Sequence, residues 1–175
     1  MSWITKDSTQ ANYEKRDKPW LSKAMKDRWT KDLLPRYATS QGALMMILHD
    51  VQHEHGYIPT QAMFEVAQFL EITPGDVMDT VTFYEDFFTE PVGKCVIAVC
   101  QSMACEVCGH QAILDHLRDV LNIEPHETTD DGLFTLLELE CLGSCDTAPV
   151  ALFGETLHEN LTIERVDELI AEHRR

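Results

Sequence analysis

Six cysteines are the residues best able to do chemistry in this 175-residue chain, and they all lie between positions 95 and 145. Cys100 and Cys105 enclose four residues, Cys141 and Cys145 enclose three, and 35 residues separate the two pairs. The chain begins without an apolar secretory segment, so a disulfide scaffold is disfavoured and clustered cysteines point to metal or redox chemistry. The spacing predicts a site made by two cysteine pairs.

Three kinds of site remain open on spacing alone. A [2Fe–2S] cluster takes four thiolates, here Cys100, Cys105, Cys141 and Cys145. A structural zinc site would instead pair the C-x₂-C of Cys105 and Cys108 with Cys141 and Cys145, leaving Cys100 free. A thiol redox site of the thioredoxin type would need only a C-x₂-C.

The elements around the cysteines predict how the pairs meet. Cys95–Cys100 is a near-continuous apolar run, as in a strand buried on both faces, and Leu133–Leu139 predicts a second strand. Each cysteine pair begins where one of these strands ends, so adjacent strands would bring the two loops together. The rest of the unit is expected to be a helix from about Gly109, strands at Pro149–Phe153 and Thr156–His158, and a helix capped by Thr162. The order β-α-β-β-β-α predicts a thioredoxin-like α/β domain over residues 91–175.

The preceding residues divide into two parts. Residues 1–36 are expected to form a charged N-terminal arm, with a short helix over Ser22–Leu34 and a start that is poorly ordered until it docks. Residues 37–90 form a helical bundle, in which Leu44 opens an apolar face of helical period, Gly56 ends the first helix and Thr73 caps the third. The expected fold class is therefore α+β, a helical bundle followed by an α/β domain.

Charge is distributed unevenly and excludes some partners. Residues 1–40 hold nine Lys/Arg and five Asp/Glu, a net charge of +4. Residues 41–175 hold five Lys/Arg and 25 Asp/Glu, a net charge of −20. Such an acidic surface repels nucleic acid and anionic lipid. Apolar runs are far shorter than the roughly 18–20 residues that cross a bilayer, so no direct membrane insertion is expected. The N-terminus carries neither a secretory nor a mitochondrial signal, and a cytoplasmic location is expected.

Several motifs resemble those of one family. Over roughly residues 38–170 the chain is similar to the thioredoxin-like [2Fe–2S] electron-transfer subunit of NADH:quinone oxidoreductase, respiratory complex I. The matching stretches are Ser40–Leu44, Gly56–Pro59, the T-F-Y-x-x-F segment ending at Phe87, Thr128–Thr135, and the E-C-L-G-x-C-x-x-A-P signature from Glu140 to Pro149.

This resemblance implies one [2Fe–2S] cluster, with Cys100, Cys105, Cys141 and Cys145 as its ligands. It also implies a partner subunit that binds FMN and NADH, within a larger multi-subunit oxidoreductase complex. This chain would then carry electrons only, and it has no G-x-G-x-x-G or P-loop motif of its own. The module alone does not identify the complex, since NAD-dependent formate dehydrogenases and NAD-linked hydrogenases share it. Within a complex I-like assembly, the chain would sit at the cytoplasmic face of the inner membrane.

The chain departs from the family pattern beside the second expected ligand. Glu106-Val107-Cys108-Gly109 stands where the family usually has Met-Leu-Arg-Gly, so a positive charge is lost and Cys108 takes its place. That loss is expected to lower the reduction potential of a cluster. Cys95 lies inside a strand and is expected to be a core residue, and Cys108 is expected to be a helix-start residue beside the site.

Overall fold

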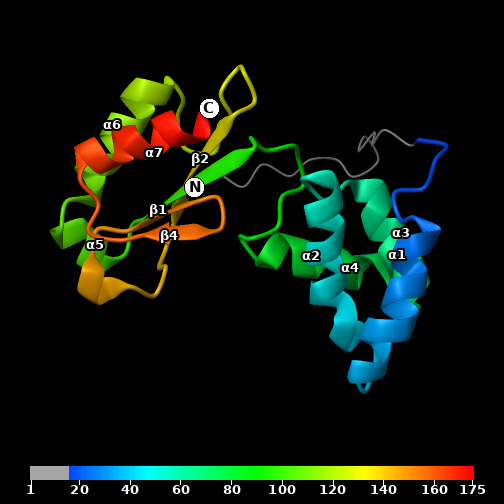
Figure 1. Ribbon diagram of the computed structural model, residues 1–175. Coiled ribbons are helices and arrows are strands. Elements are labelled where there is room, and N and C mark those ends of the chain that lie inside the picture. Colours follow the sequence, from blue (N-terminus) through cyan, green and yellow to red (C-terminus); the bar gives the residue numbers. More distant parts are fainter. Residues whose placement is uncertain (1–15) are drawn as a thin grey trace, which may run out of the picture. The chain divides into compact units, whose positions relative to one another are not determined.

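The computed structural model describes residues 16–175 and contains two compact units, which divide between Pro91 and Val92 (Figure 1). The first unit is helical and the second is built on a sheet. Each unit has its own hydrophobic core. The expected α+β architecture, a helical bundle followed by an α/β domain, is confirmed.

Four α-helices make up most of the first unit: α1 (Lys23–Arg28), α2 (Leu44–His55), α3 (Thr60–Leu70) and α4 (Pro74–Phe83). A π-helical turn (Trp29–Leu33) extends α1. Gly56 ends α2 with a left-handed φ of 80°, as expected. Thr73 caps α4 through a reciprocal capping box with Asp76. The N-cap of α3 is Pro59, and Thr60 is the first helical residue.

Part of the stretch expected to form a charged arm contributes to this core. Leu21, Met25 and Trp29 are buried, although most of their neighbours in sequence are charged or polar. The Glu65 carboxylate accepts a hydrogen bond from the backbone amide of Leu21, and Asp50 accepts one from the Trp29 indole. The expected disorder at the start of the arm lies outside the described residues.

The second unit has a four-stranded mixed sheet in the order β2-β1-β3-β4. Its strands are β1 (Cys95–Cys100), β2 (Phe134–Leu139), β3 (Ala151–Phe153) and β4 (Thr156–His158). The edge strand β2 pairs with β1 in parallel, with Cys100 opposite Leu139, and the other pairs are antiparallel. Because β1 and β2 run in the same direction, the loops that carry the two cysteine pairs both begin at the carboxyl ends of these strands.

Three helices accompany the sheet: α5 (Met103–Val107), α6 (His110–Leu121) and α7 (Ile163–His173). The helices α6 and α7 contact each other and lie side by side over one face (Figure 1). Their apolar sides meet the strands in a core that includes Leu117, Leu136 and Leu169. Thr162 caps α7 as expected. The short helix α5 occupies part of the segment for which the sequence predicts a loop.

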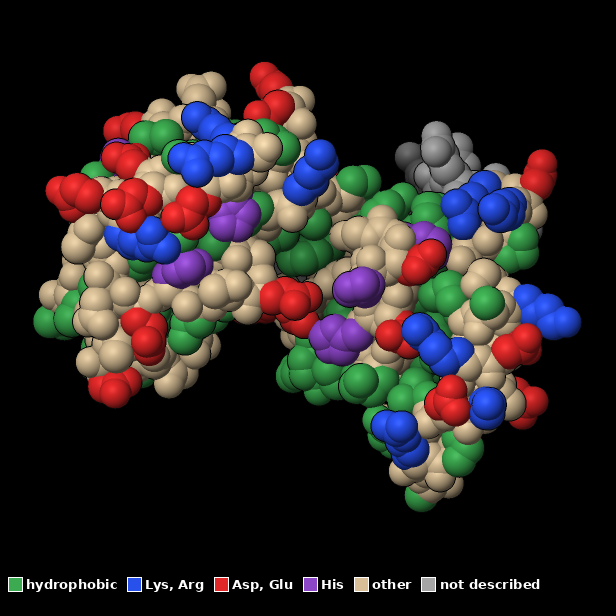
Figure 2. Space-filling view, in the orientation of Figure 1, with side chains coloured by type: hydrophobic (Ala, Val, Ile, Leu, Met, Phe, Trp, Pro, Cys, Tyr) green, Lys and Arg blue, Asp and Glu red, His purple; other side chains and the backbone are tan. Residues whose placement is uncertain are grey.

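Lys and Arg side chains gather over α1, whereas Asp and Glu side chains are spread over the second unit around α6 and α7 (Figure 2). Within residues 16–175, no helix is both long and apolar enough to cross a bilayer.

Candidate metal centre

The parallel pairing of β1 and β2 fixes where the cysteine loops begin. Cys100 is the last residue of β1, and Cys141 follows β2 after one intervening residue. The Gln101 amide continues the ladder by donating to the Leu139 carbonyl at 2.9 Å. Cys105 then lies in α5, and Cys145 begins a 3₁₀ turn (Cys145–Thr147).

The four thiols meet as two contacting pairs. Cys100 and Cys105 lie close enough to perturb each other's acidity, and Cys141 perturbs that of Cys145. Cys145 also interacts electrostatically with Cys100, which links the two pairs. Among residues 16–175, no three His, Cys, Asp or Glu side chains surround a point where a single metal ion could bind.

The pairs differ in exposure. Cys100 and Cys105 are buried, at 2% and 1% exposed, in a small apolar cluster with Val150. Cys141 and Cys145 are exposed. A group bound between the pairs would have one side in protein and the other near solvent.

Hydrogen bonds and neighbouring thiols perturb the acidity of these cysteines. Burial opposes ionisation of Cys100, but its hydrogen bond with the Ser102 hydroxyl and those from the backbone amides of Ser102 and Leu142 outweigh this effect, so the pKa of Cys100 is lowered. Burial and the adjacent Cys100 raise the pKa of Cys105. Contact with Cys141 raises the pKa of Cys145. Crowded thiols resist simultaneous deprotonation unless a cation compensates their charge, which is what bound metal supplies.

Backbone amides surround the sulfur atoms. The Leu142 amide donates to Cys100 and the Val150 amide donates to Cys105. The Gly143 amide donates to Cys141 Sγ at 3.4 Å, from a residue with a φ of 78° that favours glycine. These donors can stabilise negative charge on thiolate sulfurs.

A hydroxyl–carboxylate network supports the second cysteine loop. Glu159 Oε1 accepts hydrogen bonds from Ser144 Oγ at 2.5 Å and from Thr147 Oγ1 at 2.7 Å. The Asn160 amide donates to the Thr147 carbonyl at 2.8 Å. The segment between β4 and α7 thus holds the loop that carries Cys145.

The remaining two cysteines lie apart from these pairs. Cys95 is buried in β1 at 5% exposed, and burial raises its thiol pKa, so its expected role in the core is confirmed. Cys108 is exposed, directly after the last residue of α5 and two residues before α6 begins. The zinc alternative would need Cys108 in place of Cys100, whereas Cys100 is the residue that perturbs the acidity of both Cys105 and Cys145.

Sequence reasoning overlooked Ser102 and Glu159, which contact the cysteine loops. Ser102 directly precedes α5, where a serine is usually explained by helix capping. Glu159 is remote in sequence from the residues it binds. Only the fold shows that both belong to this site.

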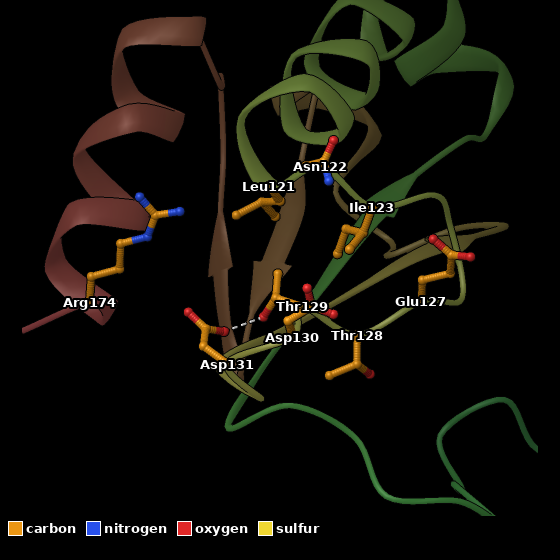
Figure 3. Close-up of a pocket in the computed structure, with 9 residues that line it drawn as sticks. All are labelled: Leu121, Asn122, Ile123, Glu127, Thr128, Thr129, Asp130, Asp131 and Arg174. Carbon is orange, nitrogen blue, oxygen red and sulfur yellow. Dashed lines mark hydrogen bonds between the residues drawn. The ribbon is translucent and has the colours of Figure 1, made fainter.

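A separate hollow of about 610 Å³ lies beside the segment that leads into β2 (Figure 3). It is lined by Leu121, Asn122, Ile123, Glu127, Thr128, Thr129, Asp130, Asp131 and Arg174. It adjoins the amino end of β2, whereas the cysteines lie beyond the carboxyl ends of β1 and β2. The lining of this hollow carries three carboxylates and one guanidinium, so its charge disfavours binding of the phosphates of a dinucleotide.

The chain is similar to proteins of known kind. Residues 30–174 match the family model described as thioredoxin-like [2Fe–2S] ferredoxin. The chain is 42% identical over 139 residues to an E-type subunit of the NADH-quinone oxidoreductase of Rhizobium meliloti (strain 1021), covering 79% of this chain and 83% of that protein. It is 39% identical over 138 residues to the E-type subunit of the NADH-quinone oxidoreductase of Escherichia coli (strain K12), with the same coverage.

A solved structure shares the fold. The air-oxidised NAD⁺-reducing [NiFe]-hydrogenase superposes with a TM-score of 0.68 at 27% identity, over 79% of this chain. This chain spans 24% of the hydrogenase chain that it matches.

Proposed function

Since this chain belongs to the thioredoxin-like [2Fe–2S] ferredoxin family, we propose that Cys100, Cys105, Cys141 and Cys145 hold one [2Fe–2S] cluster through which an NADH-dependent oxidoreductase transfers electrons. The single observation that carries this assignment is the meeting of these four thiols as two pairs. Two thiolates on each of two irons need that grouping, whereas one tetrahedral zinc needs four ligands around a common centre.

The residues around the thiols suit a cluster of this charge. Two Fe³⁺, two sulfides and four thiolates sum to about −2, and one-electron reduction, the chemistry that the cluster supplies when bound, brings the sum to about −3. The amides of Leu142, Gly143 and Val150 face cysteine sulfurs and offset this charge. The acidic second unit acts in the opposite direction and favours a low potential.

A flavin-bearing partner subunit is the proposed electron donor or acceptor. Met103 and Val107 lie one turn apart on α5, on either side of Cys105, and are 84% and 83% exposed. Apolar side chains left in solvent beside a redox centre favour contact with another protein. We assign this pair to the interface with a subunit that binds FMN and NADH, because this chain lacks a dinucleotide motif.

The parent complex is proposed to be an NADH:quinone oxidoreductase. The relatives with that name are about 40% identical over most of their length, whereas the hydrogenase match is 27% identical over a quarter of a longer chain. A place in an NAD-dependent formate dehydrogenase or an NAD-linked hydrogenase is the alternative within the same family. In the favoured complex, the chain would lie on the cytoplasmic side of the membrane.

Single Cys→Ser substitutions in the full chain test the ligand assignment. Cys100→Ser is expected to remove or strongly alter the visible absorption and the EPR signal of the reduced protein, together with bound iron and sulfide. Cys108→Ser is the matched control and should leave about two irons and two sulfides per chain. The assignment is overturned if Cys108→Ser abolishes metal binding while Cys100→Ser retains it, since a zinc site through Cys108 predicts that pattern.

A second measurement tests the partner. Met103→Asp and Val107→Asp should reduce co-purification of a flavin-containing subunit without changing the cluster content of this chain. Val120→Asp provides a control, because Val120 is an exposed apolar residue on α6, away from the cysteine loops. If these variants co-purify with as much flavin as wild type, the α5 surface is not part of the interface.

A further inference from the structure

We propose that Ser102 is a positioning residue of the metal centre, whose hydroxyl donates a hydrogen bond to the cysteine sulfurs and raises the reduction potential of the bound cluster. This inference rests on the proposed function, because it takes Cys100, Cys105 and Cys145 as ligands. It assigns a role to a residue that is not itself a ligand.

The hydroxyl of Ser102 does not cap α5, although Ser102 is at the N-cap position. Ser102 is the N-cap residue of α5, with φ −66° and ψ 161°. A serine there usually accepts a hydrogen bond from an amide in the first turn. Ser102 makes no such side-chain bond, in contrast to Ser22 at the start of α1, which accepts from the Met25 amide. Its hydroxyl is therefore available to other groups.

That hydroxyl lies among three thiols drawn from both pairs. Ser102 Oγ is 3.4 Å from Cys100 Sγ, and it lies close enough to Cys105 and Cys145 to influence the acidity of both thiols. The side chain is partly buried. One small side chain thus contacts both the loop after β1 and the loop after β2.

Metal binding determines the direction of these hydrogen bonds. A protonated thiol can donate to Ser102 Oγ, as Cys100 does. Once the cysteines lose their protons to bind iron, their sulfurs can only accept, and the Ser102 O–H becomes the donor. The hydroxyl then opposes part of the negative charge on the sulfurs.

Reduction increases that negative charge, so a donor stabilises the reduced form more than the oxidised form. Loss of the hydroxyl is expected to shift the ratio of reduced to oxidised cluster about tenfold toward the oxidised form at a fixed ambient potential. For a one-electron couple, this equals a midpoint about 59 mV lower. A serine that served only as a helix cap would change stability and leave the midpoint unaltered.

The test compares wild type with three Ser102 variants in the cluster-loaded full-length protein. Ser102→Ala and Ser102→Gly both remove the hydroxyl, and glycine is itself well tolerated before a helix, so one of them should retain the fold. Ser102→Thr keeps the hydroxyl and should restore the wild-type midpoint. Midpoints are measured by mediated redox titration followed by EPR, and thermal unfolding is recorded in parallel.

Ser144→Ala is the matched control. Ser144 also adjoins a proposed ligand in sequence, but its hydroxyl bonds to Thr147 and Glu159. Its removal should shift the midpoint less than loss of the Ser102 hydroxyl.

The outcomes separate this inference from the proposed function. A wild-type chain that shows no [2Fe–2S] signal overturns both. A normal wild-type signal with an unchanged midpoint in Ser102→Ala and Ser102→Gly overturns the role of Ser102 alone. A lowered midpoint in these two variants, restored in Ser102→Thr, supports it.

Discussion

Replacement of Gly93 by alanine tests how β1 and β2 are brought together. Gly93 lies just before β1, and a Cβ placed on it would be 2.6 Å from the Phe134 carbonyl carbon and 2.9 Å from that of Leu133. These are backbone atoms at the start of β2, so they cannot rotate away. The Gly93 amide also donates to Thr135 Oγ1 at 2.7 Å inside the protein. The added methyl group must therefore push the two chain segments apart.

The expected loss is about 1–3 kcal/mol of unfolding free energy, the usual cost of inserting a carbon into a tightly packed site. With a urea m-value of about 2 kcal/mol/M, the midpoint should fall by roughly 0.5–1.5 M. The backbone hydrogen bond from the Cys95 amide to the Leu133 carbonyl, at 2.8 Å, is the next contact that would be strained. Weaker pairing here also loosens the frame that carries both cysteine loops.

Urea unfolding followed by far-UV circular dichroism measures this loss. Trp20 and Trp29 pack in the core of the first unit and the second unit contains no tryptophan, so tryptophan fluorescence does not report on the sheet. Gly75→Ala is the control, because its Cβ would meet only Thr73 Oγ1 at an ordinary 3.5 Å. That change should be neutral or slightly stabilising. A Gly93→Ala midpoint equal to or above the wild-type value would refute the close approach of these segments.

Three further substitutions probe other parts of the chain. Asp50→Ala leaves the buried indole N–H of Trp29 without its acceptor at 2.6 Å and should cost about 1–3 kcal/mol, measured by tryptophan fluorescence during urea unfolding. Hydrogen bonds from Thr73 lower the pKa of Asp76 below 3.8, so its contribution to stability is present above that pH and lost as the pH falls through the folded-state pKa. Asp76→Asn should therefore destabilise at pH 7, with a difference from wild type that shrinks in acid. Glu159→Gln removes a negative charge beside the second cysteine loop and should raise the cluster midpoint in a redox titration.

Each of these changes has a matched exposed control. Asp27→Ala, Asp79→Asn and Glu155→Gln alter the same residue types outside the interactions just described. An Asp50 variant as stable as the Asp27 variant would contradict the role of the indole bond. A stability difference for Asp76→Asn that persists unchanged below pH 3 would contradict the charged cap. A lower midpoint in Glu159→Gln would contradict the electrostatic effect expected of this carboxylate.

Much of the second unit could be predicted because its local signals agree with its fold. The apolar run at Cys95–Cys100 predicts the inner strand β1 with its observed bounds, and Thr162 marks the start of α7. The helix α5 could not be found in the same way. Cys105 is the only residue that it buries, while Met103 and Val107 face solvent, so it has no amphipathic pattern.

The burial of Trp29 could not be predicted from the sequence for a different reason. Its neighbours are charged, and the groups that fix it, such as Asp50, come from helices further along the chain. Ser102 was hidden because a serine before a helix already has an ordinary explanation. Contacts between residues far apart in sequence, and the direction in which a hydroxyl points, depend on the fold. Composition and periodicity do not predict them.

The most direct test of the cluster assignment is ⁵⁷Fe Mössbauer spectroscopy of the purified full-length chain, before and after reduction by one electron. We predict about two irons per chain, both ferric and coupled when oxidised, and one ferric and one ferrous site after reduction. Protein that binds one zinc and no iron, when produced in iron-replete cells, would contradict the assignment.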